Sequence, residues 1–181
     1  MEELFATRRP YLIELDMAET LGSLCDKLTI IKLKQWHSTD KARLKSLAGQ
    51  EALLLEEIDE FVAGALTGLI REERLTFQSN KVFKKKGNTV AAVTGAMGAV
   101  MAQLADVNCR LWHEQEKVYD FEHVPDAEKG ALMRQLAVLN LERNRCMEAI
   151  DRNLLAEVVR RRKAAAKKKK VVAGRRPRRA V

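Results

Sequence analysis

Twelve basic residues and no acidic ones occupy residues 160–181, which we call the basic arm. Its lysines and arginines come in three groups of four: Arg160, Arg161, Arg162, Lys163, Lys167, Lys168, Lys169, Lys170, Arg175, Arg176, Arg178 and Arg179. Runs of this kind are typical of segments that bind nucleic-acid phosphates. Because the arm has no aromatic residue to stack on bases, we expect it to bind DNA or RNA without sequence preference.

The positive charge of the chain belongs to the arm alone. The whole sequence has 33 basic and 25 acidic residues and a net charge of +8, whereas residues 1–159 have a net charge of −4. An acidic body with a cationic appendage suggests a tether. If about eight arm charges met phosphates, the slope of log affinity against log salt concentration would be near −7 on duplex DNA or −5 to −6 on single strands.

Other interpretations of the arm are a nuclear-localisation signal, if the cell is eukaryotic, and a solvated segment with no partner. Adhesion to anionic lipid is a third, but no amphipathic anchor or lipidation motif accompanies the basic groups, so we expect no membrane contact.

A second kind of chemistry is suggested by polar residues that lie on or beside apolar helical seams. Two acids, two histidines, an amide and an arginine could form a polar site between helices, with the acids and histidines moving protons and the arginine holding an anion. These candidate catalytic residues are Asp26, His37, Asn108, His113, Glu116 and Arg143. We favour the alternative, a buried hydrogen-bond network that fixes helix register.

The segments that carry these residues resemble a loose group of uncharacterised bacterial helical domains. The shared pattern is Asp-Lys-Leu-Thr-Ile with a later His, then Asn-x-x-Leu-Trp, then Asn-x-x-Arg-Asn, which here begin at Asp26, Asn108 and Asn140. The resemblance covers roughly residues 20–155 and implies a helical fold but no activity. His113 and Gln115 stand where that pattern commonly has an acid.

A carboxylate pattern suggests an alternative, enzymatic function. Glu56, Glu57 and Glu60 on one expected helix and Asp106 on the next resemble the E-E-x-x-E and E-x-x-D motifs of the MazG-like nucleotide pyrophosphohydrolases. That resemblance implies bound Mg²⁺, but Gln103 replaces the acid that begins the second motif. A solvated acidic helix face explains the same residues, and our main expectation is no metal and no cofactor.

Helical spacing predicts the elements that position all these residues. Apolar residues three and four apart predict helices over about 17–37, from about 40 to the mid-60s, over 89–121 and from 127 to at least 159. Asp40 and Asp126 are suited to cap helix starts. We therefore predict an all-α antiparallel bundle of about four helices, with a lead-in segment (1–16), a helical bundle domain (17–159) and a disordered basic tail (160–181).

The expected helix over 89–121 has the most regular seam, and self-association through that seam is one expected partner contact. The three cysteines have no C-x-x-C spacing, which favours a reducing compartment, cytoplasmic or nuclear. We therefore expect a non-enzymatic binding or assembly protein whose body contacts protein and whose arm contacts nucleic acid. A small enzyme with a polar inter-helix site is the alternative.

Overall fold

The computed structural model describes residues 18–77, 90 and 92–174, with side chains described as far as residue 168. Its helices are α1 (Leu21–Trp36), α2 (Lys41–Thr67), α3 (Met97–Tyr119) and α4 (Asp126–Gly174). Two single turns of 3-10 helix, η1 (Glu72–Arg74) and η2 (Phe121–His123), follow α2 and α3. The described residues contain no strand, and the predicted all-α class with four helices is confirmed.

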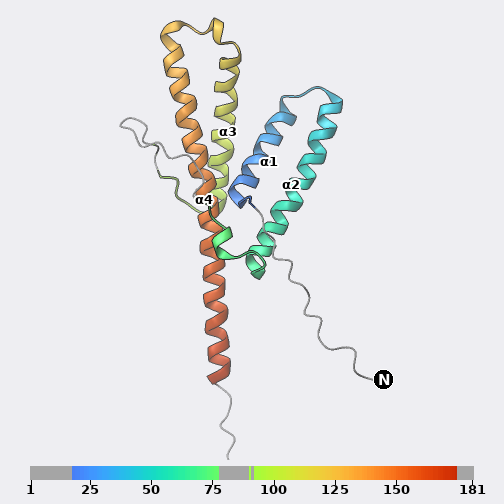
Figure 1. Cartoon of the computed structure of the whole chain (residues 1–181), viewed down its shortest axis with the longest axis vertical. Coiled ribbons are helices and arrows are strands. Elements are labelled where there is room, and N and C mark those ends of the chain that lie inside the picture. The colour runs from blue at the N-terminus through green and yellow to red at the C-terminus, as the bar shows by residue number, and fades with distance from the viewer. Residues whose placement is uncertain (1–17, 78–89, 91, 175–181) are drawn as a thin grey trace, which may run out of the picture.

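The helices form two antiparallel hairpins, α1 with α2 and α3 with α4 (Figure 1). Helix α1 packs against all three other helices, whereas few residues of α2 contact α4. The largest fully buried side chains include Leu24, Phe61, Leu104, Leu139 and Ile150, at least one from each helix. The helical spacing in the sequence therefore identified the inward faces correctly.

Local hydrogen bonds explain where the first two helices begin. Thr20 and Ser23 form a reciprocal capping box at the start of α1. The Asp40 carboxylate accepts a 2.7 Å hydrogen bond from the backbone N–H of Arg43, so the predicted cap of α2 is confirmed. Helix α2 ends at Thr67, with Gly68 as its cap.

The predicted start of the third helix, at residue 89, is wrong. Helix α3 begins at Met97, and the described residues between 90 and 96 are not helical. Gly95 has φ +136°, a conformation outside the helical region that glycine adopts at low cost. Val93 is nevertheless buried, so it reaches the core from this non-helical segment.

The apolar seam of α3 is covered by the chain itself. Val100, Leu104 and Val107 are each 1% exposed or less, and α3 packs against α4 and α1. Within this chain, these three residues of the seam are therefore used for intramolecular packing.

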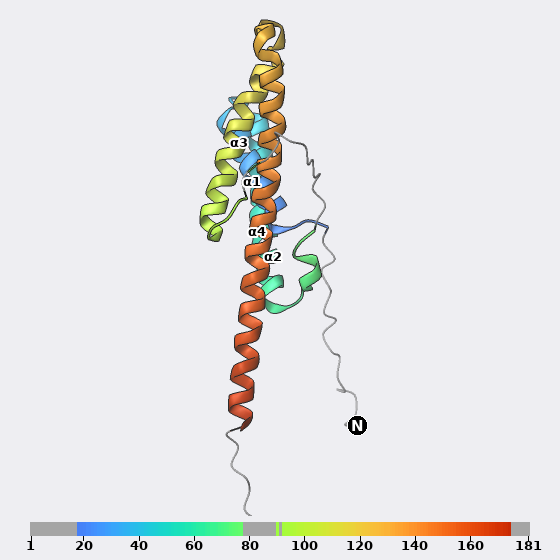
Figure 2. The ribbon, with the colours of Figure 1, turned by 90° about the vertical axis from the view of Figure 1, so that its left-hand side faces the viewer.

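Helix α4 is one continuous element of 49 residues that belongs to both the body and the arm. Its first part packs in the body as far as Val158, and the rest runs on past the other helices (Figures 1 and 2). The boundary at residue 160 is thus one of charge, and the helix crosses it. Residues 164–166 are alanines, and residues 160–173 contain neither glycine nor proline, which favours a helix over 160–174. Residues 175–181 lie outside the described residues.

Candidate functional site

The first residues of the basic arm are held by acids of the body. Arg160 donates two 2.7 Å hydrogen bonds to Glu157, and Arg161 donates one of 2.6 Å to the same carboxylate. These two arginines lower the pKa of Glu157 to about 2. Arg162 forms an ion pair with Glu72 of η1, which is 90 residues away in the sequence. The Arg162–Glu72 pair thereby connects the base of the arm to another element of the body.

Beyond Arg162 the arm presents its charges to solvent. Lys163, Lys167 and Lys168 are exposed, and no ion pair joins them to any other described side chain. The backbone remains helical through Lys169 and Lys170, whose side chains are outside the described set. The remaining four predicted contacts lie outside the described residues: Arg175, Arg176, Arg178 and Arg179.

A second cluster joins three of the candidate catalytic residues from three helices. Arg143 of α4 donates from Nε to Asp26 Oδ1 of α1 at 2.7 Å and from Nη2 to Asp26 Oδ2. Asn108 of α3 donates from Nδ2 to the same Oδ1 at 2.9 Å. Asp26 is 4% exposed and Asn108 is fully buried. We call Asp26, Asn108 and Arg143 the buried triad.

Thr29 extends the buried triad by one residue. Its hydroxyl accepts a 2.6 Å hydrogen bond from Asn108 Nδ2 and donates at 2.8 Å to the backbone carbonyl of Asp26. No hydrogen-bond donor of the described residues reaches Asn108 Oδ1. The hydrogen bonds to Asp26 raise the pKa of Arg143, and burial lowers it by a smaller amount. Arg143 therefore keeps its positive charge in this pair.

This geometry favours a structural role for the buried triad, in which it fixes the register of the helices relative to one another. Both oxygens of Asp26 are occupied by donors, which leaves this carboxylate poorly placed to take a proton from a substrate. A bidentate arginine–carboxylate pair has a strict geometry, so it ties α1 to α4 in one register. Asn108 ties α3 to the same carboxylate. The expected polar network between helices is what these three residues form.

One side of the buried triad faces a groove of about 430 Å³. Asp26 and Arg143 lie on its wall, and Leu53, which is 60% exposed, lies on the opposite helix, α2. Lys27 and Lys34 of α1 add positive charge to the rim. The Arg143 side chain is 31% exposed, so its guanidinium lies at the edge of the groove.

The other candidate catalytic residues gather in a separate, exposed cluster where α1 ends beside α3. His37 stacks on Trp112 with ring centroids 4.7 Å apart, and the His37 and His113 rings lie 6.1 Å apart edge to face. Glu116 accepts 2.8 Å from Trp112 Nε1 and lies 3.3 Å from His113 Nδ1. The hydrogen bond from Trp112, followed by that from His113, lowers the pKa of Glu116.

The structure does not gather the carboxylates of the magnesium hypothesis. Glu56, Glu57 and Glu60 are exposed on α2, and exposed Asp106 on α3 pairs with Arg110 at 2.9 Å. Over residues 18–77, 90 and 92–168, no three histidine, cysteine, aspartate or glutamate side chains converge as metal ligands would. These four residues therefore form no common site.

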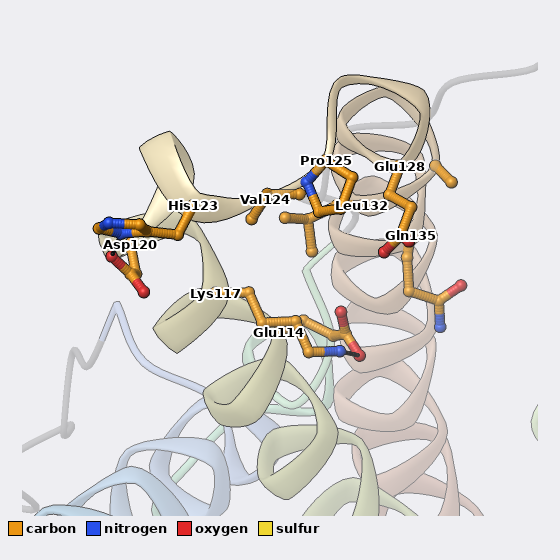
Figure 3. Close-up of a pocket in the computed structure, with 10 residues that line it drawn as sticks. Glu114, Lys117, Asp120, His123, Val124, Pro125, Glu128, Leu132 and Gln135 are labelled. Atoms are coloured by element: carbon orange, nitrogen blue, oxygen red, sulfur yellow. Dashed lines mark hydrogen bonds and ion pairs between the residues drawn. The ribbon is translucent and has the colours of Figure 1, made fainter.

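Another groove lies at the turn between α3 and α4 and has a volume of about 490 Å³ (Figure 3). Glu114 and Lys117 pair across 2.9 Å on one side of it, and Glu128 and Gln135 of α4 line the other. None of the predicted site residues lines this groove. It therefore adds no support to the enzymatic alternative.

Sequence reasoning missed the contact between Asp151 and the start of α1. Asp151 of α4 is 5% exposed and accepts a 2.7 Å hydrogen bond from the backbone N–H of Gly22. Burial raises the pKa of Asp151 to about 6, against the lowering effect of this hydrogen bond and one from Thr20. The sequence signal was an acid within the apolar face of α4, but nothing marked Gly22 as its partner.

This raised pKa makes the stability of the protein depend on pH. Because the folded-state pKa of Asp151 lies above its ordinary value of 3.8, ionisation disfavours the folded state. The free energy of unfolding from this group should be highest in acid and fall by about 1 to 1.5 kcal/mol between pH 5 and pH 7.5. Asp151→Asn keeps the acceptor for Gly22 and removes the charge. Urea unfolding of both proteins at the two pH values should show this difference only in the wild type, and equal pH dependence would contradict it.

Comparisons with known proteins leave the chain without an identified relative. No family model, no curated protein and no solved structure matches it. Of the helices that the structure describes, none has a stretch both long and apolar enough to traverse a lipid bilayer.

Proposed function

We propose that this chain is a non-enzymatic binding protein whose acidic helical body carries a basic helical arm that binds nucleic acid without sequence preference. The observation that carries the proposal is the course of α4, which begins in the buried core and continues past residue 160 into exposed, acid-free sequence. A cationic segment held in this way is presented to a ligand.

The charge distribution supports an intermolecular partner for the arm. Among the arm side chains that the structure describes, the first three arginines meet carboxylates of the body, and Lys163, Lys167 and Lys168 are exposed to solvent. Lysines and arginines that neutralise phosphates release condensed counterions, which drives binding at low salt. Phosphates are alike in every sequence, so this contribution carries no base preference.

We propose protein contacts as the function of the body. Trp36 and Tyr119, the last residues of α1 and α3, are 85% and 84% exposed, and exposed aromatic residues are common at protein interfaces. Cys25, Cys109 and Cys146 are free thiols, which fits a reducing compartment. Burial raises the pKa of Cys25 and of Cys146 to about 11, so neither is an activated nucleophile.

Neutralising part of the arm tests this proposal. The triple variant Lys163→Gln, Lys167→Gln, Lys168→Gln removes three exposed charges and retains good helix formers. If all three meet phosphates, the slope of log affinity against log salt should become about 2.7 less steep on duplex DNA. Fluorescence anisotropy with a labelled oligonucleotide between 50 and 300 mM salt measures this slope.

The matched control changes the same number of charges on the body. Lys41→Gln, Arg43→Gln, Lys45→Gln alters three exposed residues in the first turns of α2 and leaves the carboxylate cap of Asp40 in place. The control should retain both the wild-type affinity and its salt slope. Equal losses in the two triple variants would show that net charge, and not the arm, determines binding.

A further inference from the structure

Residues 160–174 of the arm are helical in the structure of the chain alone. It continues α4 directly from Leu154 and Val158, which are 4% and 1% exposed in the core, and the Arg162–Glu72 ion pair braces its first turn against η1. A binding element that is already folded loses less conformational entropy on association than a disordered one. The shape of this helix can therefore contribute to the choice of ligand.

The basic residues of this helix surround its axis. Residues 160–163 and 167–170 are two groups of four consecutive basic residues, and each group starts seven residues, or about two turns, from the other. With about 100° between neighbouring residues, four in a row are spread over the whole circumference. The three alanines between the groups keep the helix narrow. The first group is partly neutralised by Glu157 and Glu72, whereas the second, 167–170, places a basic position on every side of the helix.

A helix that is basic on all sides matches a ligand with phosphates on both of its flanks. A lipid surface or an extended single strand would neutralise only one face. The major groove of B-form DNA is about 12 Å wide and is bordered by two phosphate backbones, and an α-helix of about 10–12 Å diameter fits within it. The major groove of A-form RNA is too narrow and deep for this.

We infer that the ligand of the arm is duplex DNA of B form, with residues 163–174 of α4, beyond the arginines that pair with Glu157 and Glu72, lying along the major groove. This inference rests on the proposed function and names the nucleic acid to which it applies. The lysines of this segment reach the phosphates of both strands, and the small alanines allow the helix backbone to approach the bases. The absence of aromatic residues from 160–181 removes the stacking on which binding to single strands depends.

The test compares three ligands with the full-length chain. Affinity is measured at one salt concentration for a 30-base-pair DNA duplex, an RNA duplex of the same sequence and one DNA strand alone, each compared at equal phosphate concentration. We expect roughly tenfold tighter binding to duplex DNA than to either of the others. Equal affinity for DNA duplex and single strand, or for DNA and RNA duplexes, would overturn this inference and leave the proposed function standing. No binding to any of the three would overturn the proposed function itself.

A helix-breaking variant separates shape from charge. Ala165→Pro keeps every basic residue but interrupts the helix between the two groups, whereas Ala165→Gln at the same position preserves it. The proline variant should lose the preference for duplex DNA and retain salt-dependent binding to single strands. The glutamine variant should behave as the wild type. An unchanged duplex preference in the proline variant would show that charge alone selects the ligand and would also overturn the inference.

Discussion

Replacing Arg143 with methionine should lower the free energy of unfolding by about 3 to 5 kcal/mol. Methionine retains much of the aliphatic bulk of arginine but leaves the Asp26 carboxylate without its ion partner at a position only 4% exposed. Asn108 would be the remaining donor to that carboxylate from α3. Urea unfolding at pH 7, followed by circular dichroism, measures the loss.

Replacing Asp26, the acid of the same pair, should lower the free energy of unfolding by less. Asp26→Asn leaves the Arg143 side chain, which is 31% exposed, free to turn toward the groove and water, so we expect a loss of about 1 to 2 kcal/mol. The double variant Asp26→Asn, Arg143→Met contains no buried unpaired charge and should be more stable than Arg143→Met alone. A loss from Asp26→Asn as large as that from Arg143→Met would contradict the burial asymmetry on which this argument depends.

Gly22→Ala should also lower the free energy of unfolding, by about 2 to 3 kcal/mol. A β-carbon at residue 22 would lie 2.3 Å from the backbone oxygen of Met147 and 2.7 Å from its carbonyl carbon. Since both are backbone atoms, the crossing of α1 and α4 must open to admit a methyl group. That movement would also stretch the hydrogen bond from Gly22 to Asp151.

The same substitution elsewhere provides the control for Gly22. Gly49 lies within α2, where an added β-carbon would meet nothing within 4 Å. Gly49→Ala should therefore raise the free energy of unfolding by about 0.5 to 1 kcal/mol, because alanine is the better helix former. Thermal or urea unfolding of the two variants should show opposite signs, and a neutral Gly22→Ala would mean that the two helices are not in close contact.

Much of the fold could be predicted from spacing, because burial selects one face of each helix. Leu21, Leu24 and Ile31 recur at helical intervals in the sequence and are buried in α1. Asp40 predicted the start of α2, because its side chain can accept a hydrogen bond from a backbone N–H of the first turn, here that of Arg43. Where the prediction was wrong, at residues 90 and 92–96, alanine, valine and threonine are compatible with either a helix or an extended segment. The conformation of Gly95 decides between them, and the sequence does not record it.

The site was predictable in kind but not in detail. Polar residues on apolar seams predicted a hydrogen-bonded network, because a lone polar group in a core is costly. Of the six candidates, Asp26, Asn108 and Arg143 bond to one another, and His37, His113 and Glu116 lie elsewhere. The sequence could not separate the buried triad from the exposed cluster of His37, Trp112 and its neighbours. That separation depends on the positions of α1 and α4 along the axis of α3. The contact of Gly22 with Met147 likewise depends on the angle at which α1 crosses α4.

Binding of the full-length chain to duplex DNA, measured from 50 to 300 mM salt, tests most directly whether the exposed end of α4 is a nucleic-acid ligand site. With about eight phosphates neutralised, log affinity should fall linearly with log salt at a slope near −7. Absence of binding at 50 mM salt, or an affinity that does not change with salt, would contradict the assignment of the arm to nucleic acid.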